Sequence, residues 1–367
     1  MPSSKITTVS ELKNYLYLAM QLEHATLPAY LTALYSIKPG TNTDAVHILR
    51  VVAVEEMLHL TIAANLLNAI GGTPDLTRPG FVPSYPTYLP DGETDFTVGI
   101  LRFGKEAVET FKKIERPSKG DGRLVRRSYA AGTSVLGRHP ESDEMHFYSI
   151  GDFYKAIADG FELLEAEAQG LGRTIFTGDP KRQVTSEYYY SGGGTLFAVT
   201  DLESAKRAIT LVMTQGEGTE SSIYDGDDEL SHYYRFDQLT HGRYYQKGDE
   251  PHHPTGPALT VDWEASYPIA ANVKLADFPA GTELSDAARS FNQAYAKFLK
   301  TITRAYDGKP ELLLAAVPLM FDFRNLITEL VRNPLPDSAG CNAAPTFEID
   351  AVTAAEALAA AREEVVA

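Results

Sequence analysis

Two long stretches near the N-terminus carry apolar side chains at three- and four-residue steps, which predicts two amphipathic helices. The first runs from Ser10 to Ser36 and ends before Pro39-Gly40, and the second runs from about Asp44 to Ala69. Gly71-Gly72 stops the second helix, since glycine commonly follows a helix end. Because the link between the helices is short, we expect an antiparallel helical hairpin.

Acidic and imidazole side chains interrupt the apolar stripes near the middle of both predicted helices. Glu56 and His59 are three residues apart, so both side chains lie on one helix face and can reach one metal ion. At about 100° per residue, Glu55 lies about 40° from His59, on the side of His59 away from Glu56. Glu23 lies about 40° from Ala19, a member of the first stripe. Since the midpoints of an antiparallel hairpin come level, Glu23, Glu56 and His59 should meet in the core.

These buried carboxylates predict a bound cation, because a cluster of them is tolerated when its charge is neutralised. Carboxylate oxygens with one or two imidazoles suit iron, and to a lesser extent manganese. Cys341 is the single cysteine, which excludes a disulfide within the chain and a cysteine-rich zinc or iron–sulfur site. Two metal-free roles stay open: salt bridges could account for Glu55, and a hydrogen bond in the core could account for His59.

The second half of the chain should supply the rest of such a site. In ferritin-like bundles that bind two metal ions, two helices give one glutamate each and the other two give a Glu-x-x-His pair each. Glu229 and His232 have that spacing. Glu217 lies between two glycines at a helix break, and Glu165 lies at the edge of another apolar face. An insertion that splits one helix could leave Glu217 and His232 close together, and periodicity alone does not choose among these carboxylates.

The fold class we expect is mainly α: a helical bundle with long loop and short-strand insertions and extra C-terminal helices, in one large domain over residues 1–367. Phe96 to Leu101 alternates weakly, as a strand would, and the Ala- and Glu-rich segment from Val352 suggests a last short helix. We divide the chain into a hairpin (1–74), an insertion (75–148), a second helical part (149–245), a loop (246–282), a helix pair (283–335) and a tail (336–367).

Helical patterning predicts six further elements after the hairpin. They span about Lys105 to Ile114, Ile150 to Leu171, Leu202 to Gln215, Glu229 to Tyr245, Glu283 to Tyr306 and Pro310 to Arg332.

The net charge of −16 makes nucleic acid and an anionic membrane surface improbable partners, because both are negatively charged. No basic stretch followed by an apolar core marks a signal peptide between Met1 and Ser10. No uncharged apolar run reaches the roughly 18 residues of a membrane span. We therefore expect a cytoplasmic protein.

Seven segments spread over nearly the whole chain carry a resemblance to a known family. They are Gln21 to Tyr30, Val54 to His59, Asn65 to Pro74, Ile150 to Tyr154, Gln215 to Thr219, Ser231 to Phe236 and Ala344 to Glu348. Together they resemble a bacterial ferritin-like family whose members include the iminophenyl-pyruvate dimer synthases of violacein- and rebeccamycin-type pathways.

This resemblance implies an α-helical bundle with long insertions and a carboxylate–histidine site for one or two iron ions. It favours Glu217 over Glu229 in the second half of the site. The chain departs from the plain ferritin pattern because that half lacks a continuous Glu-x-x-His helix. The metal ligands implied by position are Glu23, Glu56, His59, Glu217 and His232.

The function we expect is that of an iron-dependent, non-haem di-iron oxidase or oxygenase. It would act with dioxygen on a small organic, amino-acid-derived substrate, with oxidative dimerisation of imines as one outcome by analogy. Segments around Pro83 to Leu101 and Thr219 to Asp228 could gate the pocket, and a homo-oligomer is compatible with the sequence. The alternatives are an iron-binding or iron-sequestering protein without turnover and a metal-free structural or partner protein.

Overall fold

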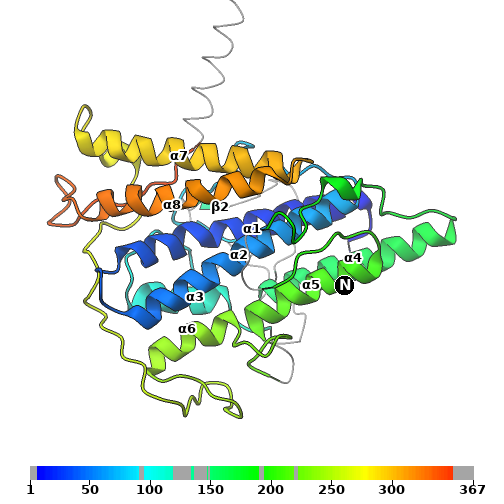
Figure 1. Cartoon of the computed structure of the whole chain (residues 1–367), viewed down its shortest axis with the longest axis horizontal. Coiled ribbons are helices and arrows are strands. Elements are labelled where there is room, and N and C mark those ends of the chain that lie inside the picture. Colours follow the sequence, from blue (N-terminus) through cyan, green and yellow to red (C-terminus); the bar gives the residue numbers. More distant parts are fainter. Residues whose placement is uncertain are drawn as a thin grey trace, which may run out of the picture.

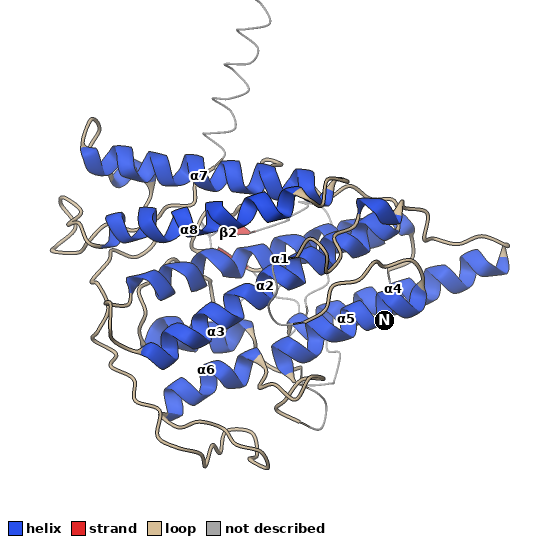
Figure 2. Ribbon diagram, viewed as in Figure 1, coloured by secondary structure: helices blue, strands red, loops and turns tan. Residues whose placement is uncertain are grey.

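The fold is mainly α, as a computed structural model of the chain shows. The structure describes residues 6–90, 95–118, 134–135, 147, 149–189, 194–218 and 222–349. Eight α-helices lie within these residues, joined by loops and two short strands (Figure 2). The predicted tail helix from Val352 and much of the insertion at 75–148 lie outside the described residues.

The first two helices form the expected hairpin at the centre of the molecule (Figure 1). Helix α1 spans Val9–Ser36, and helix α2 spans Thr43–Ala69. Thr8 caps α1 by accepting a hydrogen bond from the Glu11 backbone N–H, and the Glu11 side chain caps Thr8 in return. Since other helices pack on several sides of the hairpin, its middle part is buried all round, polar side chains included.

Four shorter helices cover one side of the hairpin and take the places of the other two helices of a four-helix bundle. Helices α4 (Ile150–Gly170) and α5 (Leu202–Glu217) pack against each other, and so do α3 (Lys105–Ile114) and α6 (His232–His241). Helix α1 contacts α3 and α4, whereas α2 contacts α5 and α6. Each of these two bundle positions is therefore filled by two helices in succession, with a break between them.

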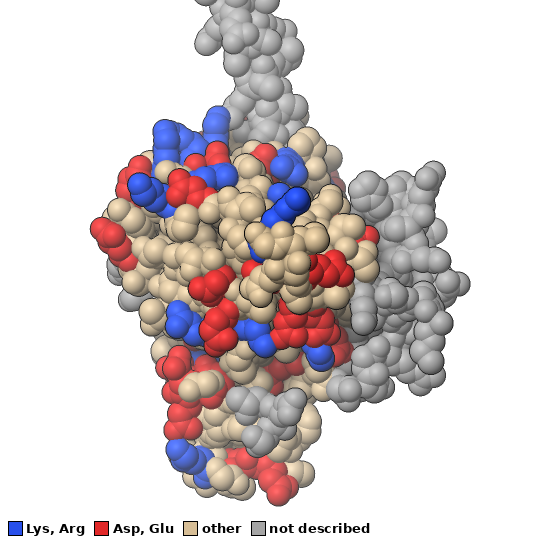
Figure 3. Space-filling view, turned by 90° about the vertical axis from the view of Figure 1, so that its right-hand side faces the viewer, with Lys and Arg blue, Asp and Glu red and all other residues tan. Residues whose placement is uncertain are grey.

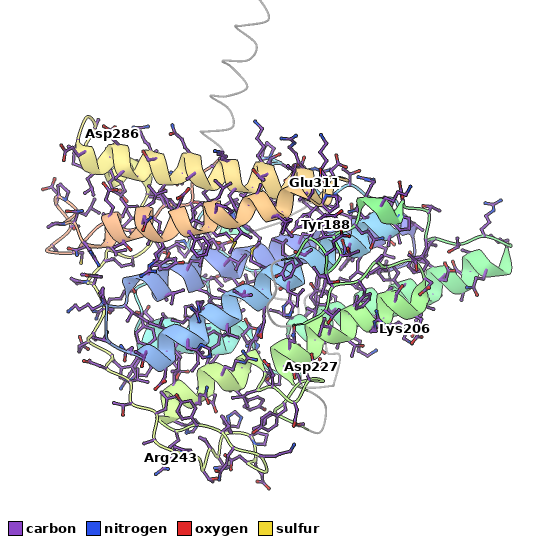
Figure 4. The ribbon with its side chains drawn as sticks, in the orientation of Figure 1. Tyr188, Lys206, Asp227, Arg243, Asp286 and Glu311 are labelled. Atoms are coloured by element: carbon purple, nitrogen blue, oxygen red, sulfur yellow. The ribbon has the colours of Figure 1, made fainter. Side chains whose placement is uncertain are left out.

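The break between α5 and α6 explains why α6 is shorter than the helix predicted from Glu229 to Tyr245. Asp225 closes a turn, because its carboxylate accepts the Glu229 backbone N–H and its own N–H donates to the Glu229 carbonyl. The helix then begins at His232 and ends at Gly242, whose φ of +66° is readily adopted by glycine. Asp227, labelled in Figure 4, lies in this break.

Two long helices cover the opposite side of the hairpin (Figure 1). They are α7 (Glu283–Tyr306) and α8 (Leu312–Val331). Two single-turn 3-10 helices lie at Pro180–Arg182 and Leu275–Asp277.

The strand predicted from Phe96 to Leu101 does not form. Val98 makes only an isolated bridge with Thr87, because the backbone of Ile100 is bonded to Asn272 instead. The Ile100 N–H donates to the side-chain oxygen of Asn272, and the Asn272 N–H donates to the Ile100 carbonyl. The strands β1 (Thr87–Tyr88) and β2 (Ser134–Val135) pair in parallel over two residues each.

Acidic side chains are spread over the face of the molecule seen in Figure 3, with Lys and Arg side chains between them. This agrees with the net charge of −16. Among the described residues, no helix has the length and apolar character that crossing a lipid bilayer requires.

Candidate metal centre

Five ionisable side chains meet inside the bundle, at the middle of the hairpin and at the breaks in the shorter helices. Glu23 comes from α1, and Glu56 and His59 come from α2. Glu115 directly follows α3, and His232 is the first residue of α6. All five are buried, with exposed fractions from 0% for His232 to 3% for Glu115. The structure therefore brings together four of the five predicted ligands and adds Glu115.

The two imidazoles point the same ring nitrogen at the carboxylates. His59 Nδ1 lies 3.5 Å from Glu23 Oε2 and 3.8 Å from Glu56 Oε1. His232 Nδ1 lies 2.9 Å from Glu56 Oε1 and 3.5 Å from Glu115 Oε2. Glu56 Oε1 therefore lies between the two imidazoles, with one further glutamate beside each of them.

The other nitrogen of each imidazole has a fixed partner. His59 Nε2 lies 2.8 Å from the Gln215 side-chain oxygen, and His232 Nε2 lies 2.7 Å from Glu55 Oε2. Glu55 also pairs with Arg235 at 3.3 Å. Histidines that bind metals almost always donate their second N–H to such an oxygen, which leaves the first nitrogen free to coordinate. The salt bridge considered for Glu55 thus forms with Arg235. Glu55 in addition supports His232 through its contact with Nε2.

Each of the three facing carboxylates has its second oxygen held by a hydroxyl group. Tyr154 donates to Glu23 Oε1 at 2.5 Å, and Tyr30 donates to Glu115 Oε1 at 2.5 Å. The hydroxyl of Thr26 donates to Glu56 Oε2 at 3.2 Å. These contacts leave one oxygen of each carboxylate directed at the imidazoles, which is the arrangement that a shared cation would need.

The charges of this cluster perturb its pKa values strongly. Burial and the neighbouring Glu115 raise the pKa of Glu56 to about 8. Burial lowers the pKa of His232, but the neighbouring carboxylates of Glu115, Glu55 and Glu56 outweigh it and raise the value well above the usual range. The pKa of His59 is also raised, because the hydrogen bond and charge of Glu23 outweigh burial. The cluster therefore favours bound positive charge, supplied by protons or by a metal ion.

The surroundings of His232 Nδ1 are compatible with a bound metal ion. This nitrogen is fully buried and makes no hydrogen bond of suitable geometry to any described residue, although two carboxylate oxygens lie within 3.5 Å. A buried polar nitrogen without a hydrogen bond is costly. Glu56, His59 and His232 also offer ligand atoms that all lie within 4.8 Å of one another. Three carboxylates and two imidazoles form a donor set that suits iron.

Glu217, the fifth predicted ligand, lines a small cavity of about 10 Å³ together with Glu23, Glu56, His59 and Glu115, but it has other partners. Its Oε2 accepts hydrogen bonds from the Ser118 hydroxyl at 2.7 Å and the Ser118 N–H at 3.0 Å. Its Oε1 accepts the Gly151 N–H at 2.7 Å, at the N-terminus of α4. Burial raises the pKa of Glu217, and these hydrogen bonds oppose the rise. Its role as a ligand stays a prediction.

The other two carboxylates considered in the sequence lie elsewhere. Glu165 is buried, but its oxygens accept hydrogen bonds from Thr174, Gln169 and the Ile175 N–H. Glu229 is exposed and pairs with Arg235 at 2.8 Å.

Glu115 was missed, although the sequence contains a signal for it. It lies four residues after Phe111, which belongs to the buried face of α3, so the same face continues onto Glu115. The periodicity of α3 could thus have placed this carboxylate toward the core.

Comparison with known proteins supports the fold. Residues 16–241 match the family model described as Ferritin-like, which is more than half of the chain. The chain belongs to the ferritin-like family. The matched region contains all of the residues of the candidate metal centre. This confirms the expected fold class and the family resemblance.

Two individual proteins are similar to this chain. It is 26% identical over 325 residues to dichlorochromopyrrolate synthase of Lentzea aerocolonigenes, covering 82% of this chain and 29% of that protein. The chain thus spans less than a third of the length of this curated relative. A ferritin-like protein of Caulobacter vibrioides has a similar structure, with a TM-score of 0.61 and 22% identity. That match covers 94% of this chain and 100% of the other, and it shows the fold alone.

Proposed function

We propose that this ferritin-like protein is an iron-dependent oxidase or oxygenase that acts on a small organic substrate. The observation that carries the proposal is the pair of imidazole Nδ1 atoms that face three buried carboxylates. Both nitrogens lie within 3.8 Å of Glu56 Oε1. When iron is bound there, it would supply the binding and reduction of dioxygen.

The arrangement suits two ions better than one. Glu23 and His59 form one pair, Glu115 and His232 form another, and Glu56 lies between them. A carboxylate between two pairs of ligands is in the position of a bridge. Glu217 lines the same cavity and is the remaining carboxylate that could complete a set of four.

The protein's own contribution is orientation and the exclusion of water. Tyr154, Tyr30 and Thr26 fix the carboxylates, while Gln215 and Glu55 fix the ring nitrogens that do not face the centre. All five ligand side chains are buried, so the centre is shielded from water and charges there interact strongly. Ligands held in this way are ready for a metal ion without rearrangement.

The substrate class follows from the relative rather than from the geometry. The name dichlorochromopyrrolate synthase indicates an enzyme that assembles a product of secondary metabolism, and that activity belongs to a protein of which the match covers only 29%. We propose that this chain takes an amino-acid-derived substrate of related chemistry, with oxidative coupling of imines as the first reaction to test. Iron sequestration without turnover is the alternative that the same centre supports.

The test is iron analysis of protein purified from iron-supplemented cells, with His59→Ala as the critical variant. We expect one to two iron ions per wild-type chain and less than a tenth as many in the variant. His47→Ala is the matched control, because His47 is exposed on the same helix and should leave the iron content unchanged. Wild-type protein with less than a tenth of an iron per chain would rule out the proposal.

Turnover separates an enzyme from a sequestering protein. Ferrous protein exposed to dioxygen should show a transient absorbance and consume a coupled substrate in a fixed ratio. Many irons taken up per chain, with no substrate consumed, would instead support sequestration.

A further inference from the structure

A second group of metal-ligating side chains lies at the far end of α6, outside the centre described above. Arg243, labelled in Figure 4, follows this end of the helix. We propose that Asp237, His241 and His252 form a separate site for a zinc ion. The sequence alone favours a solvated histidine pair at His252 and His253, but the fold brings His252 back against α6.

Two distances in this cluster are close to the edges of a tetrahedron around zinc. His241 Nε2 lies 3.3 Å and His252 Nδ1 lies 3.7 Å from the same oxygen, Asp237 Oδ2. Zinc bonds of about 2.0 to 2.2 Å place tetrahedral ligand atoms roughly 3.3 to 3.6 Å apart. All three residues offer ligand atoms within 4.8 Å of one another. Both contacts are longer than the roughly 2.7 to 2.9 Å of a charge-assisted hydrogen bond.

Secondary structure and a braced loop hold the three side chains together. Asp237 and His241 are four residues apart on α6, so they lie on one face of the helix. His252 reaches them from the loop that follows, where its φ of +65° turns the chain. Its backbone N–H donates to the Tyr245 hydroxyl at 3.0 Å, and that hydroxyl donates to Asp237 Oδ2 at 2.5 Å. The aspartate is thus tied to the backbone that carries His252.

The loop has further supports that do not depend on a metal ion. Asp249 accepts the backbone N–H groups of Gln246 and Thr255, which closes the loop on both sides of His252. The rings of Tyr233 and Tyr234 lie 5.8 and 6.3 Å from the His252 ring. A ligand held in this way loses little freedom when an ion binds.

The exposure of the two histidines lets a cation reach the cluster from solvent. Asp237 is 1% exposed, and Lys112 pairs with its Oδ1 at 2.9 Å, whereas its Oδ2 faces the histidines and also accepts the Tyr245 hydroxyl. The side chains of His241 and His252 are 37% and 56% exposed. One carboxylate and two imidazoles leave a fourth position for water, as in zinc sites with three protein ligands. This donor set has one carboxylate where the buried centre has at least three.

The experiment is equilibrium dialysis of metal-stripped full-length protein against zinc chloride, with zinc per chain as the readout. His252→Asn is the critical variant, because asparagine tolerates the positive φ of this position. We expect it to bind one zinc per chain fewer than wild type. His253→Asn is the matched control, since His253 is the exposed neighbour outside the cluster and should retain the wild-type value.

A second readout assigns the lost ion to this cluster. Cobalt should give the intense visible bands of a tetrahedral site in a His59→Ala background, and adding His241→Ala should remove them. Zinc that binds only at the buried centre would be lost in His59→Ala and unchanged in His252→Asn. That outcome, or equal zinc content in wild type and His252→Asn, would overturn the second site and leave the proposed iron function untouched.

Discussion

The two halves of the candidate metal centre are built in different ways. The hairpin of α1 and α2 carries Glu23, Glu56 and His59 in the interior of long, continuous helices. The other half is carried at helix ends: Glu115 follows the last residue of α3, and His232 is the first residue of α6. One half is therefore fixed by helix periodicity, and the other half is fixed by where helices stop.

Helix ends add an electrostatic cost that the hairpin does not have. A carboxylate at a helix C-terminus and a cation at an N-terminus each oppose the helix dipole, by about 0.3 to 1 kcal/mol. Glu115 stands at the C-terminal end of α3, and a charged His232 would stand at the N-terminal end of α6. A bound metal ion would offset this cost, because it would balance the charge of Glu115 and keep His232 neutral. Glu217 is the last residue of α5 and has the same cost there, but it also accepts an N–H at the N-terminus of α4, where an anion is favoured.

This contrast predicts different effects for the two carboxylates at the breaks. Glu115→Gln should lower the iron content at least twofold, because Glu115 Oε2 faces His232 Nδ1 at 3.5 Å. Glu217→Gln should have a smaller effect, since its oxygens already accept hydrogen bonds from Ser118 and Gly151. Iron per chain after purification measures both. Thermal unfolding of the metal-free variants serves as the control for folding.

The opposite order of effects would be informative. If Glu217→Gln loses more iron than Glu115→Gln, the ligand set implied by the family resemblance is right and the contacts of Glu217 rearrange when the metal binds.

The hairpin half of the centre could be predicted from the sequence, because polar side chains on an apolar helix stripe are a strong signal. Three polar side chains on apolar stripes have few structural roles open to them, and the i, i+3 spacing of Glu56 and His59 limits these further. The fold class also followed from helical periodicity and the family resemblance. The same logic placed Glu55 near the centre, although its role as a partner of His232 depends on a contact with α6.

The other half could not be predicted as well, because periodicity carries no information beyond a helix end. His232 was a candidate from its spacing to Glu229 and was then favoured by the resemblance, whereas its partner Glu115 was overlooked at the boundary between a short helix and the insertion. The turn closed by Asp225 sets the start of α6, which moved Glu229 out of the helix and away from the site. Tyr154 and Tyr30 were equally hidden, since packing accounts for most buried tyrosines.

The two halves should respond alike when their supporting hydroxyls are removed. Tyr154 holds Glu23 on the hairpin side, and Tyr30 holds Glu115 on the helix-end side, both at 2.5 Å. Replacing either tyrosine with phenylalanine should weaken iron binding by about 10- to 100-fold, as loss of a supporting partner commonly does. Iron affinity measured by competition with a chelator tests this. Tyr85→Phe is the control, because Tyr85 is equally buried but donates to the Ala25 carbonyl. An unchanged affinity in Tyr154→Phe alone would mean that the hairpin half needs no outer support.

The smallest effect should come from crowding Glu217 at the N-terminus of α4. A methyl group added at Gly151 would lie 2.5 Å from both oxygens of Glu217, so Gly151→Ala must displace that carboxylate and break its hydrogen bonds. We expect a loss of about 1 kcal/mol in the free energy of unfolding, the usual contribution of a buried hydrogen bond. The iron content should stay near that of wild type if Glu217 serves mainly to cap α4. Gly170→Ala is the matched control, because Gly170 ends the same helix and an added methyl group meets nothing within 4 Å. Chemical denaturation gives the stability difference, and iron lost in Gly151→Ala but not in Gly170→Ala would place Glu217 among the ligands after all.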